Sequence, residues 1–472
     1  MRLDAPLGPE LAVRASDLGT PFTLPVATEI RGLARGWLML ALAALVGAGL
    51  FSILLVLART PGLQRIFPVA DFFHVALVVH VDLSVLVWFV AMAGVMWTVN
   101  SRARLIMLAQ AALVLAAVGA AFMAGSAFLG KGVPLMSNYV PVLEDPLFLY
   151  GLVIFGFGFA LLALRSLLAP SRIDPVLDGA GALRFGLNAS VVAAAVALFA
   201  LVWSWAEVPA ELSGQRYFEL LFWGGGHVIQ FTWTLLMLVA WLWLATLVGA
   251  QPPLSPRIAV LLFAIALASV FAVPIIYLAW HVTSPEHQKL HTWLMRFGGG
   301  LAILPVGLAV AIGLARAAPA GATARPLRAA LVSSLVLFSL GGAIGFLIKG
   351  SDVRIPAHYH GSIVGVTLAL MGLTYALLPR LGFSAPRGKL ATLQPYLYGG
   401  GQLLHVIGLA WSGGYGVQRK VAGAEQVLRS SKEVAAMGLM GLGGLIAVAG
   451  GLLFLVIAFH AMLERPSANA DR

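Results

Sequence analysis

Apolar segments of spanning length recur along the chain from residue 36 onward. Because a transmembrane helix needs about 20 predominantly apolar residues, this pattern predicts twelve such helices. They are expected at residues 36–58, 72–98, 105–128, 146–168, 187–206, 217–248, 257–280, 292–315, 327–348, 357–379, 393–412 and 436–462. The longest connections are expected at 129–145 and 413–435. The sequence therefore predicts an all-α, polytopic membrane protein with one twelve-helix domain over 36–463 and tails at 1–35 and 464–472.

The composition narrows the class of protein further. Sixty per cent of the residues are hydrophobic and only 10% are charged. Soluble domains carry about 25% charged residues, so a water-soluble enzyme is excluded, as is a disordered chain. The chain has no cysteine, which excludes disulfides, covalently attached c-type heme, iron–sulfur clusters and thiolate-bound copper. Any metal must therefore be held by histidine or by oxygen ligands.

The charge distribution predicts the orientation in the membrane. The net charge is +11, and an excess of Lys and Arg marks the cytoplasmic loops of a membrane protein, where it also meets anionic lipid. With the N-terminus inside, a modest excess of the basic residues falls on the inner face, including Arg31 and Arg35 before the first helix. We therefore expect cytoplasmic N- and C-termini, residues 1–35 as a retained tail, and a bacterial-type inner (cytoplasmic) membrane. The bilayer, and not nucleic acid, is the expected partner of the basic residues.

Five histidines fall at one depth under this orientation, on four separate helices: His80, His227, His281, His358 and His360. A lone histidine in a membrane helix is more often a packing residue than a ligand, but agreement among five favours a function. His358 and His360 are two residues apart, so on an α-helix they point about 200° away from each other. They cannot serve one small metal ion, but each can ligate a planar cofactor on its own side of the helix.

At these histidines the sequence resembles the catalytic subunit (subunit I) of the heme–copper oxidase superfamily. The resemblance covers nearly the whole chain, through the twelve helices and the order of the candidate ligands. It rests on the low-spin heme motif around His80, the copper motif W-x-x-G-H that ends at His227, the H-x-H pair at His358 and His360, and the run that begins at His405. Each motif alone is weak, but together they are specific.

The resemblance implies a respiratory oxidoreductase with two hemes, one low-spin and one high-spin, and a non-heme metal, copper or iron. The implied ligands are His80 and His360 for the low-spin heme, His358 for the high-spin heme, and His227 and His281 for the non-heme metal. Arg419 and Lys420 stand where the family has two arginines near the heme propionates. The implied activity is reduction of O2 to water. Electrons would come from a cytochrome c oxidase subunit II-like partner that carries a copper centre or a c-type heme, or directly from quinol.

One departure from the family concerns the non-heme metal. The family supplies two adjacent histidines at the end of helix 7, where this chain has Trp280 and His281. One ligand is therefore missing. His287 and His291 could substitute, and the alternative for them is a solvated loop and a helix start.

A second departure concerns the redox tyrosine. Many oxidases carry a tyrosine four residues after the helix-6 histidine, and this chain has Phe231 there. Tyr277, one helical turn before His281, is a candidate replacement, and a structural tyrosine is the alternative. Reduction of two NO to N2O needs only two electrons and tolerates the loss, and Gln230 could hydrogen-bond a nitrogen oxide. NO reductases often have a glutamate in helix 6, whereas here Glu219 lies eight residues before His227.

Two functions of other classes stay open at the level of the sequence. One is a subunit that binds heme but carries out no catalysis, and the other is a transporter, although no internal repeat is visible. Charged residues near the predicted site leave alternatives too. Asp82 inside helix 2 could carry protons or bond a neighbour. Lys349, Asp352 and Arg354 could neutralise heme propionates or form a solvated loop.

Overall fold

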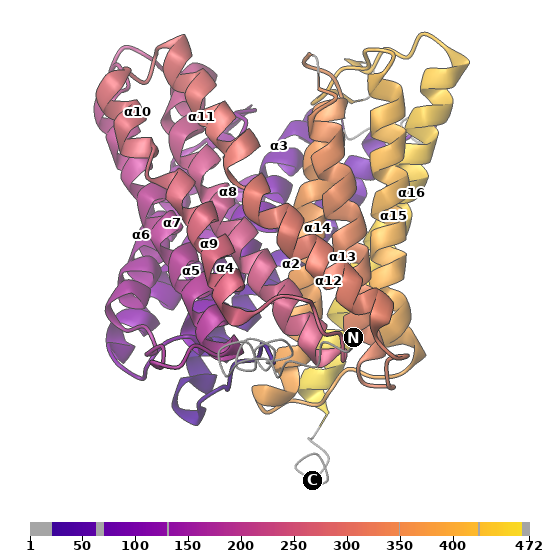
Figure 1. The fold of residues 1–472 in the computed structure, drawn as a ribbon. Helices are drawn as coiled ribbons and strands as arrows, with labels where there is room; N and C mark the ends of the chain where they lie inside the picture. Colours follow the sequence, from indigo (N-terminus) through magenta and orange to yellow (C-terminus); the bar gives the residue numbers. More distant parts are fainter. Residues whose placement is uncertain (1–20, 63–69, 130–131, 349, 423–424, 465–472) are drawn as a thin grey trace, which may run out of the picture.

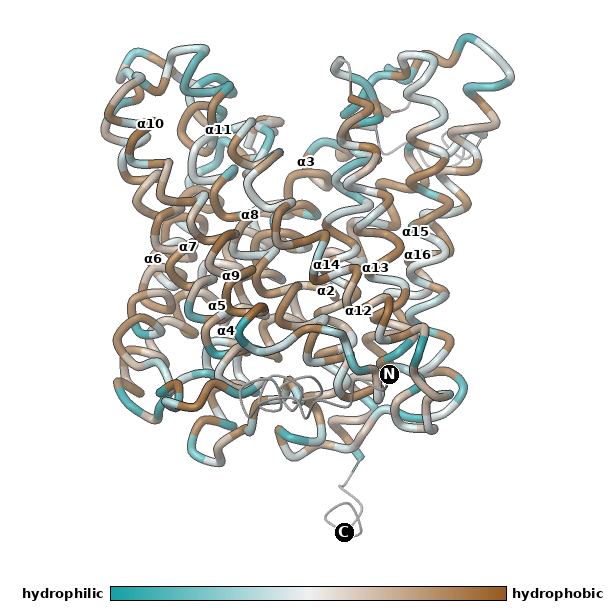
Figure 2. Tube along the Cα trace, in the orientation of Figure 1, coloured by the Kyte–Doolittle hydropathy of each residue, from teal (hydrophilic) through white to brown (hydrophobic). Residues whose placement is uncertain are grey.

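The computed structural model describes residues 21–62, 70–129, 132–348, 350–422 and 425–464 (Figure 1). Helices run roughly side by side as a bundle. Hydrophobic segments fill the middle of this bundle, and hydrophilic segments gather at its two ends (Figure 2). That distribution is the one expected of helices that cross a bilayer, because the hydrocarbon core disfavours polar groups.

The described helices carry the labels of Figure 1. In chain order they are η1 (Thr28–Ile30), α2 (Arg31–Arg59), α3 (Ala70–Val81), η3 (Asp82–Val87), α4 (Trp88–Val99), α5 (Ile106–Leu129), α6 (Pro146–Leu168), α7 (Gly179–Glu207), α8 (Gly214–Leu247), α9 (Pro256–Val270), α10 (Val273–Ala279), α11 (Pro285–Gly298), α12 (Gly300–Arg316), α13 (Arg325–Gly345), α14 (Arg354–Arg380), α15 (Lys389–Gly413) and α16 (Ser431–Leu463).

Each predicted span corresponds to one helix or to consecutive helices, so the all-α, twelve-helix prediction is confirmed. Within the described ranges, eleven spans are long and apolar enough to cross a membrane. The twelfth is α15, whose polar residues lower its hydropathy, but which packs against α13, α14 and α16. The eighth span starts at Pro285 instead of residue 292, because Ser284 caps the helix by accepting a hydrogen bond from His287 N (3.2 Å).

The first and last described helices end at the same face of the bundle. Arg35 of α2 donates from Nε to Leu381 O (2.6 Å), and Ser384 N donates to Ala461 O of α16 (3.0 Å). The turn between α14 and α15 therefore touches the start of α2 and the end of α16. An even number of spans requires this arrangement. Residues 1–20 and 465–472, which make up most of the two predicted tails, lie outside the described residues.

Helices α8 and α14 form the centre of the bundle: 83% of the apolar stretch of each is buried. Both carry candidate ligands. Glycines let the outer helices approach one another closely, as is common in membrane bundles. A Cβ atom on Gly408 of α15 would lie only 2.4 Å from Met440 N of α16, and one on Gly158 of α6 only 2.6 Å from Ala116 N of α5.

Three spans are interrupted close to candidate residues. A π-helical turn, η3, begins two residues after His80, and such turns are frequent at functional sites. Pro274 lies in the first turn of α10, just after α9 has ended. Gly299 separates α11 from α12. These breaks decide which way the side chains of the next turn point.

A β-hairpin lies within the long connection 129–145. Strands β1 (Val133–Leu135) and β2 (Val142–Glu144) pair antiparallel, with Pro134 opposite Leu143. Asp145 then caps α6 by accepting a hydrogen bond from Leu147 N (2.9 Å). The tip of the hairpin, residues 136–141, carries Tyr139 toward helix α8.

Candidate functional site

His227 lies in the middle of α8 and is only 2% exposed. Its Nδ1 bonds the Trp223 carbonyl oxygen one turn earlier (2.7 Å), so this nitrogen carries the hydrogen and Nε2 keeps its lone pair. The three glycines before His227 make room for large neighbours. A Cβ on Gly224 would lie 2.0 Å from the Tyr277 hydroxyl, and one on Gly226 would lie 2.2 Å from the ring of Tyr139.

His287 and His291 lie on consecutive turns of α11 and are both fully buried. The Ser284 cap and Pro285 fix where this helix begins, and the four-residue spacing puts both imidazoles on one face. The Nδ1 of His291 bonds the His287 carbonyl oxygen (2.9 Å), which leaves Nε2 of His291 with its lone pair. The run Ser-Pro-Glu-His-x-x-x-His is the pattern in the sequence that indicates a helix start followed by two histidines on one face.

His227, His287 and His291 form a cluster in the interior. The ring centroids of His287 and His291 are 4.4 Å apart, and those of His227 and His291 are 6.3 Å apart. Three imidazoles that share a metal at about 2.0 Å from nitrogen would have centroids roughly 4.5–6 Å apart. Among the described residues, Nε2 of His291 and both ring nitrogens of His287 are buried without a hydrogen-bond partner.

This cluster fits a metal ion by its chemistry. Buried ring nitrogens without partners cost free energy that a metal would offset, and neutral imidazole suits copper and iron. Within the part of the chain that the structure describes, no three potential ligands converge as a closed cage. The ring of His287 has no hydrogen bond among the described residues that would hold it in its present orientation.

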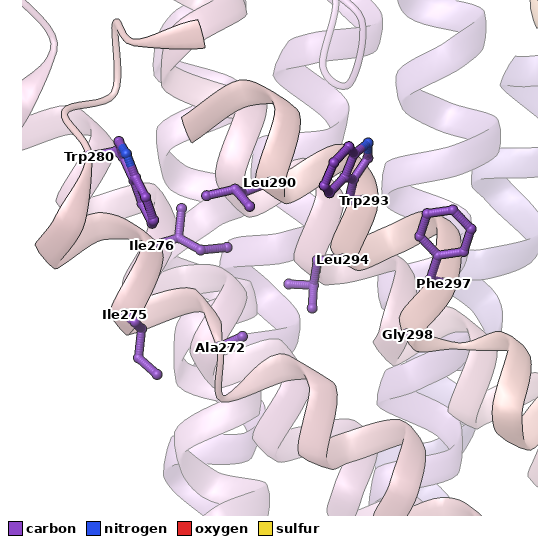
Figure 3. A pocket seen from close by; sticks show the side chains of 9 residues that line it. All are labelled: Ala272, Ile275, Ile276, Trp280, Leu290, Trp293, Leu294, Phe297 and Gly298. Atoms are coloured by element: carbon purple, nitrogen blue, oxygen red, sulfur yellow. The ribbon is translucent and has the colours of Figure 1, made fainter. Parts of the chain in front are cut away.

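His281 and Trp280 lie outside the cluster. His281 is exposed, and its Nδ1 bonds the Thr283 hydroxyl (2.8 Å). Trp280 lines an apolar pocket of about 460 Å³ with Ile275 and Trp293, on the outward side of α10 and α11 (Figure 3). The structure therefore favours His287 and His291 over His281 as partners of His227.

Neither Phe231, which occupies the position of the family's tyrosine, nor the candidate replacement Tyr277 presents a hydroxyl to the cluster. Phe231 is buried and turns toward the α11–α12 junction, because its Cζ would lie 3.0 Å from a Cβ on Gly298. The Tyr277 ring packs edge-on against His287 at 4.7 Å. Its hydroxyl donates to Ala200 O (2.9 Å) and shares a hydrogen bond with Ser204 Oγ (2.7 Å). The phenol oxygen of Tyr277 is thus bound to α7.

Tyr139, which no sequence pattern singled out, lies against His227 with ring centroids 4.7 Å apart. Its hydroxyl lies near enough to the side chain of Gln230 to interact with it electrostatically. Gln230 Nε2 also donates to Gly226 O (3.3 Å). Tyr139 therefore belongs to a hairpin outside the membrane-spanning helices. Helical periodicity in the sequence cannot reveal its contact with α8, because the two segments are far apart in the chain.

His358 lies at the start of α14, with Nδ1 bonded to Gly341 O of α13 (2.7 Å). Gly345 leaves space for the imidazole, because a Cβ there would lie 2.8 Å from its ring. Arg296 of α11 interacts electrostatically with His358 and stacks on Phe346 at 5.3 Å. The start of α14 therefore faces the helix that carries His287 and His291.

His80 and His360 lie in a second group on the far side of α14. His80 Nδ1 bonds Ala48 O (2.9 Å), and both His80 and His405 interact electrostatically with His360. The rings of His360 and His405 are 4.8 Å apart. His405 Nδ1 bonds Met440 O (3.0 Å). His405, whose run the resemblance included without a ligand role, therefore lies beside the two predicted ligands.

The predicted cation pair points in two directions. Arg419 Nε donates to Ser351 Oγ (3.3 Å). Lys420, whose backbone φ is 62°, donates from Nζ to Met136 O (2.5 Å) in the β-hairpin. Burial and the neighbouring Arg419 lower the pKa of Lys420 to about 8, against an opposing effect of Glu219.

Arg59, at the end of α2, interacts electrostatically with His360 and Tyr359. Arg59 is therefore a cation near the second group of histidines, and no sequence motif pointed to it.

The remaining charged candidates are placed as follows. Asp352 and Arg354 bind each other, with Nη2 to Oδ2 at 2.5 Å. Burial alone would raise the pKa of the Asp352 carboxyl, but the hydrogen bonds from Arg354 hold it below its usual value. Asp82 is 1% exposed, and neither carboxyl oxygen has a partner among the residues described. Lys349 lies outside the described residues.

Comparison with known proteins identifies the family to which this chain is similar. Residues 32–452 match the family described as cytochrome c and quinol oxidase polypeptide I. The chain is also 29% identical over 500 residues to an uncharacterised protein of Rickettsia prowazekii (strain Madrid E), covering 91% of this chain and 96% of that one. An uncharacterised protein of Aquifex aeolicus (strain VF5) is 31% identical over 366 residues, covering 76% and 88%.

The fold has a counterpart among solved structures. It superposes on a chain of a heme–copper terminal oxidase dimer solved by cryo-EM with a TM-score of 0.72. The superposition covers 94% of this chain and 85% of that chain, at 18% sequence identity. At that identity the likeness concerns the arrangement of helices and not the chemistry of individual residues.

Proposed function

This chain belongs to the cytochrome c and quinol oxidase polypeptide I family, and we propose that it is the catalytic subunit of a membrane-bound reductase that converts O2 to water. The family's hemes and its metal site define the general class, an integral-membrane oxidoreductase. The cluster of His227, His287 and His291 carries the proposal for this chain. All three imidazoles are buried, and among the described residues Nε2 of His291 and both ring nitrogens of His287 have no hydrogen-bond partner, which their surroundings do not otherwise explain.

In this proposal the cluster holds the non-heme metal, copper or iron. The hydrogen bonds of His227 to Trp223 O and of His291 to His287 O fix the tautomers and leave both Nε2 atoms available. Thr292 Oγ1 lies 3.3 Å from His227 Nε2 and can satisfy that atom before a metal binds. The family's helix-7 position, occupied here by Trp280 and His281, is replaced by the start of α11.

The two hemes would be held on the two sides of α14. His358, facing α11, would ligate the high-spin heme, and His80 with His360 would ligate the low-spin heme. The hemes supply one-electron transfer and an iron at which a gas can be reduced. His405 and Arg59 would tune the low-spin side, since an imidazole and a cation lie beside His360. The two terminal nitrogens of the Arg419 guanidinium would meet a heme propionate, while its Nε donates to Ser351 Oγ and Lys420 binds the hairpin.

Reduction of NO to N2O is the second candidate, and one observation favours it. Phe231 replaces the family's tyrosine, and the Tyr277 hydroxyl is engaged by Ser204 and Ala200. The two-electron reduction of NO does not require such a tyrosine. Gln230, one turn from His227, could then bind the nitrogen oxide.

The protein would work as part of a complex in a bacterial-type inner membrane. The sequence contains no cysteine, so this chain cannot itself hold the dinuclear thiolate copper centre or a covalent heme. A subunit II-like partner with one of those centres would deliver the electrons, and quinol is the alternative donor.

Purification of the complex tests the proposal directly. We expect two hemes and one non-heme metal per chain, a CO-binding ferrous heme, and turnover of O2 that exceeds turnover of NO. Turnover of NO alone would select the second candidate. Hemes without CO binding would indicate a heme-binding subunit without catalysis, and a protein without heme would leave the transporter class.

A further inference from the structure

A β-hairpin outside the membrane-spanning helices places a phenol inside the candidate site. The Tyr139 ring is 4.7 Å from the His227 ring and 6.1 Å from the Trp223 ring, centroid to centroid. A side chain on Gly226 would occupy the same space as Tyr139. The glycine and the tyrosine are therefore complementary in shape, although 87 residues separate them in the sequence.

Two sets of hydrogen bonds from different segments, called the ties below, hold the hairpin tip in this place. Glu219 of α8 accepts hydrogen bonds from the backbone N of Asn138 (3.1 Å) and from its Nδ2. Lys420, from the connection between α15 and α16, donates to Met136 O (2.5 Å) and lies 3.5 Å from Asn138 Oδ1. Glu219 and Lys420 also attract each other. Both sets of contacts hold residues within the three positions that precede Tyr139.

The contacts of Tyr139 reach two neighbouring positions of α8. Its ring contacts His227, and its hydroxyl interacts electrostatically with the side chain of Gln230, three residues later and on the same helical face. Burial raises the pKa of the Tyr139 hydroxyl, so it stays protonated across the physiological range. Phe231 and Tyr277 cannot offer a hydroxyl to Gln230 in the same way, because Phe231 lacks a hydroxyl and the hydroxyl of Tyr277 is bound to α7.

We propose that Tyr139 is a positioning residue of the gas-reducing site, which orients the His227 imidazole with its ring and the Gln230 amide with its hydroxyl. This inference rests on the proposed function. The Asn138–Glu219 and Met136–Lys420 contacts act through Tyr139, because they hold the hairpin tip against α8. The site is then completed from outside the bundle by a segment that the helical pattern does not include.

Three variants of the purified complex test this inference. Tyr139→Phe removes the hydroxyl and keeps the ring. Glu219→Leu removes both acceptors for Asn138 and puts a slightly larger apolar side chain in their place. Tyr150→Phe is the matched control, because Tyr150 is 67% exposed on α6, away from the site. The measurements are the C–O stretching band of the CO adduct, metal and heme content, kcat/KM, and hydrogen exchange of the peptide that spans residues 132–145.

We expect Tyr139→Phe to shift the C–O band and to lower kcat/KM about 2- to 10-fold, the factor for one net hydrogen bond, with metal and heme content unchanged. Glu219→Leu should shift the same band and accelerate exchange of residues 132–145 by about tenfold or more. Tyr150→Phe should match the wild type in every measurement.

An unshifted band in Tyr139→Phe would overturn the inference, and so would loss of the non-heme metal, which would make the hydroxyl a structural support of the cage. Unchanged exchange in Glu219→Leu would overturn the role of the ties. A wild-type complex that binds no CO would instead overturn the proposed function itself, so the two failures are distinguishable.

Discussion

His287 is the residue whose surroundings depart most from those of an ordinary buried histidine. Neither of its ring nitrogens has a hydrogen-bond partner in the described part of the chain, and the side chain is fully buried. Leaving a buried polar group without a partner costs about 1–3 kcal/mol. A metal ligand avoids this cost when the metal is bound, which is why we interpret the orphaned nitrogens as ligand atoms.

Replacement of the histidines one at a time should separate ligands from neighbours. We expect His287→Ala and His291→Ala to lower the affinity for the non-heme metal at least about 10- to 100-fold, the range known for supporting residues alone, while both hemes stay bound. His281→Ala is the control and should keep the metal, because His281 is exposed and bonded to Thr283. Metal analysis and heme spectra of the purified variants provide the measurement. Metal loss in His281→Ala with retention in His287→Ala would restore the assignment made from sequence.

Lys420 should make stability depend on pH. Its pKa is about 8 in the folded protein, below the ordinary value of about 10.4. Between these values the unfolded chain binds more protons than the folded one, so the free energy of unfolding rises as pH increases from about 8 to 10. The charged groups that face Lys420 are Arg419 and Glu219.

Thermal unfolding at pH 7, 8 and 9 tests this dependence. The variant Lys420→Arg keeps its charge throughout, so the wild type should gain stability relative to it as pH rises. Parallel curves for the two proteins would contradict the assignment of the lowered pKa to Lys420.

Single residues also show where sequence reasoning reaches its limit. The H-x-H spacing predicts that His358 and His360 project to opposite sides of α14, and His358 does contact α13 while His360 contacts His405. The choice between His281 and the pair His287 and His291 depended on a helix boundary seven residues away from its predicted place. Tyr139 reaches His227 through a hairpin, and such long-range contacts leave no periodic signal.

At the scale of elements, the glycine run of α8 couples this helix to one other helix and to the β-hairpin. Gly224 accommodates Tyr277 of α10, and Gly226 accommodates Tyr139 of the β-hairpin. A methyl group at either position would meet a ring that has little room to move. Overpacking of a dense interior costs about 1–3 kcal/mol.

We expect Gly226→Ala to destabilise the complex by about 1–3 kcal/mol and to displace the hairpin from α8. The control is Gly49→Ala in α2, where a Cβ meets nothing within 4 Å among the described residues. Since alanine is the better helix former, the control should be neutral or more stable by up to about 1 kcal/mol. Thermal stability together with hydrogen exchange of residues 132–145 gives the comparison. Equal exchange in both variants would mean that Gly226 does not accommodate the hairpin.

The elements themselves were predictable to a large degree. Apolar length located all twelve spans, since the bilayer requires about 20 apolar residues of each helix. Their breaks were less predictable. Pro274 and Ser284-Pro285 are local signals for helix starts, but the seven-residue α10 and the reversal at Trp280–Thr283 depend on contacts such as Glu207 Oε2 with Val282 N (3.3 Å).

For the whole molecule, the described ends of the first and last helices lie at one face. The positive-inside rule predicts that this face is cytoplasmic. The sequence has no cysteine, so one introduced cysteine reports its own side. In intact cells, a membrane-impermeant maleimide should label Lys432→Cys, at the start of α16, and should not label Arg387→Cys, between α14 and α15. Labels in the reverse order would invert the orientation.

The three imidazoles of the cluster fall within one short stretch of the chain, from His227 to His291, whereas the side chains assigned to the porphyrins extend from His80 to His360. Ribosomes add about 5–20 residues per second, so several seconds separate the appearance of His291 from that of His358. During membrane insertion the copper or iron pocket can therefore form while half of the porphyrin pocket has yet to be translated. The order of cofactor loading would then follow the direction of synthesis.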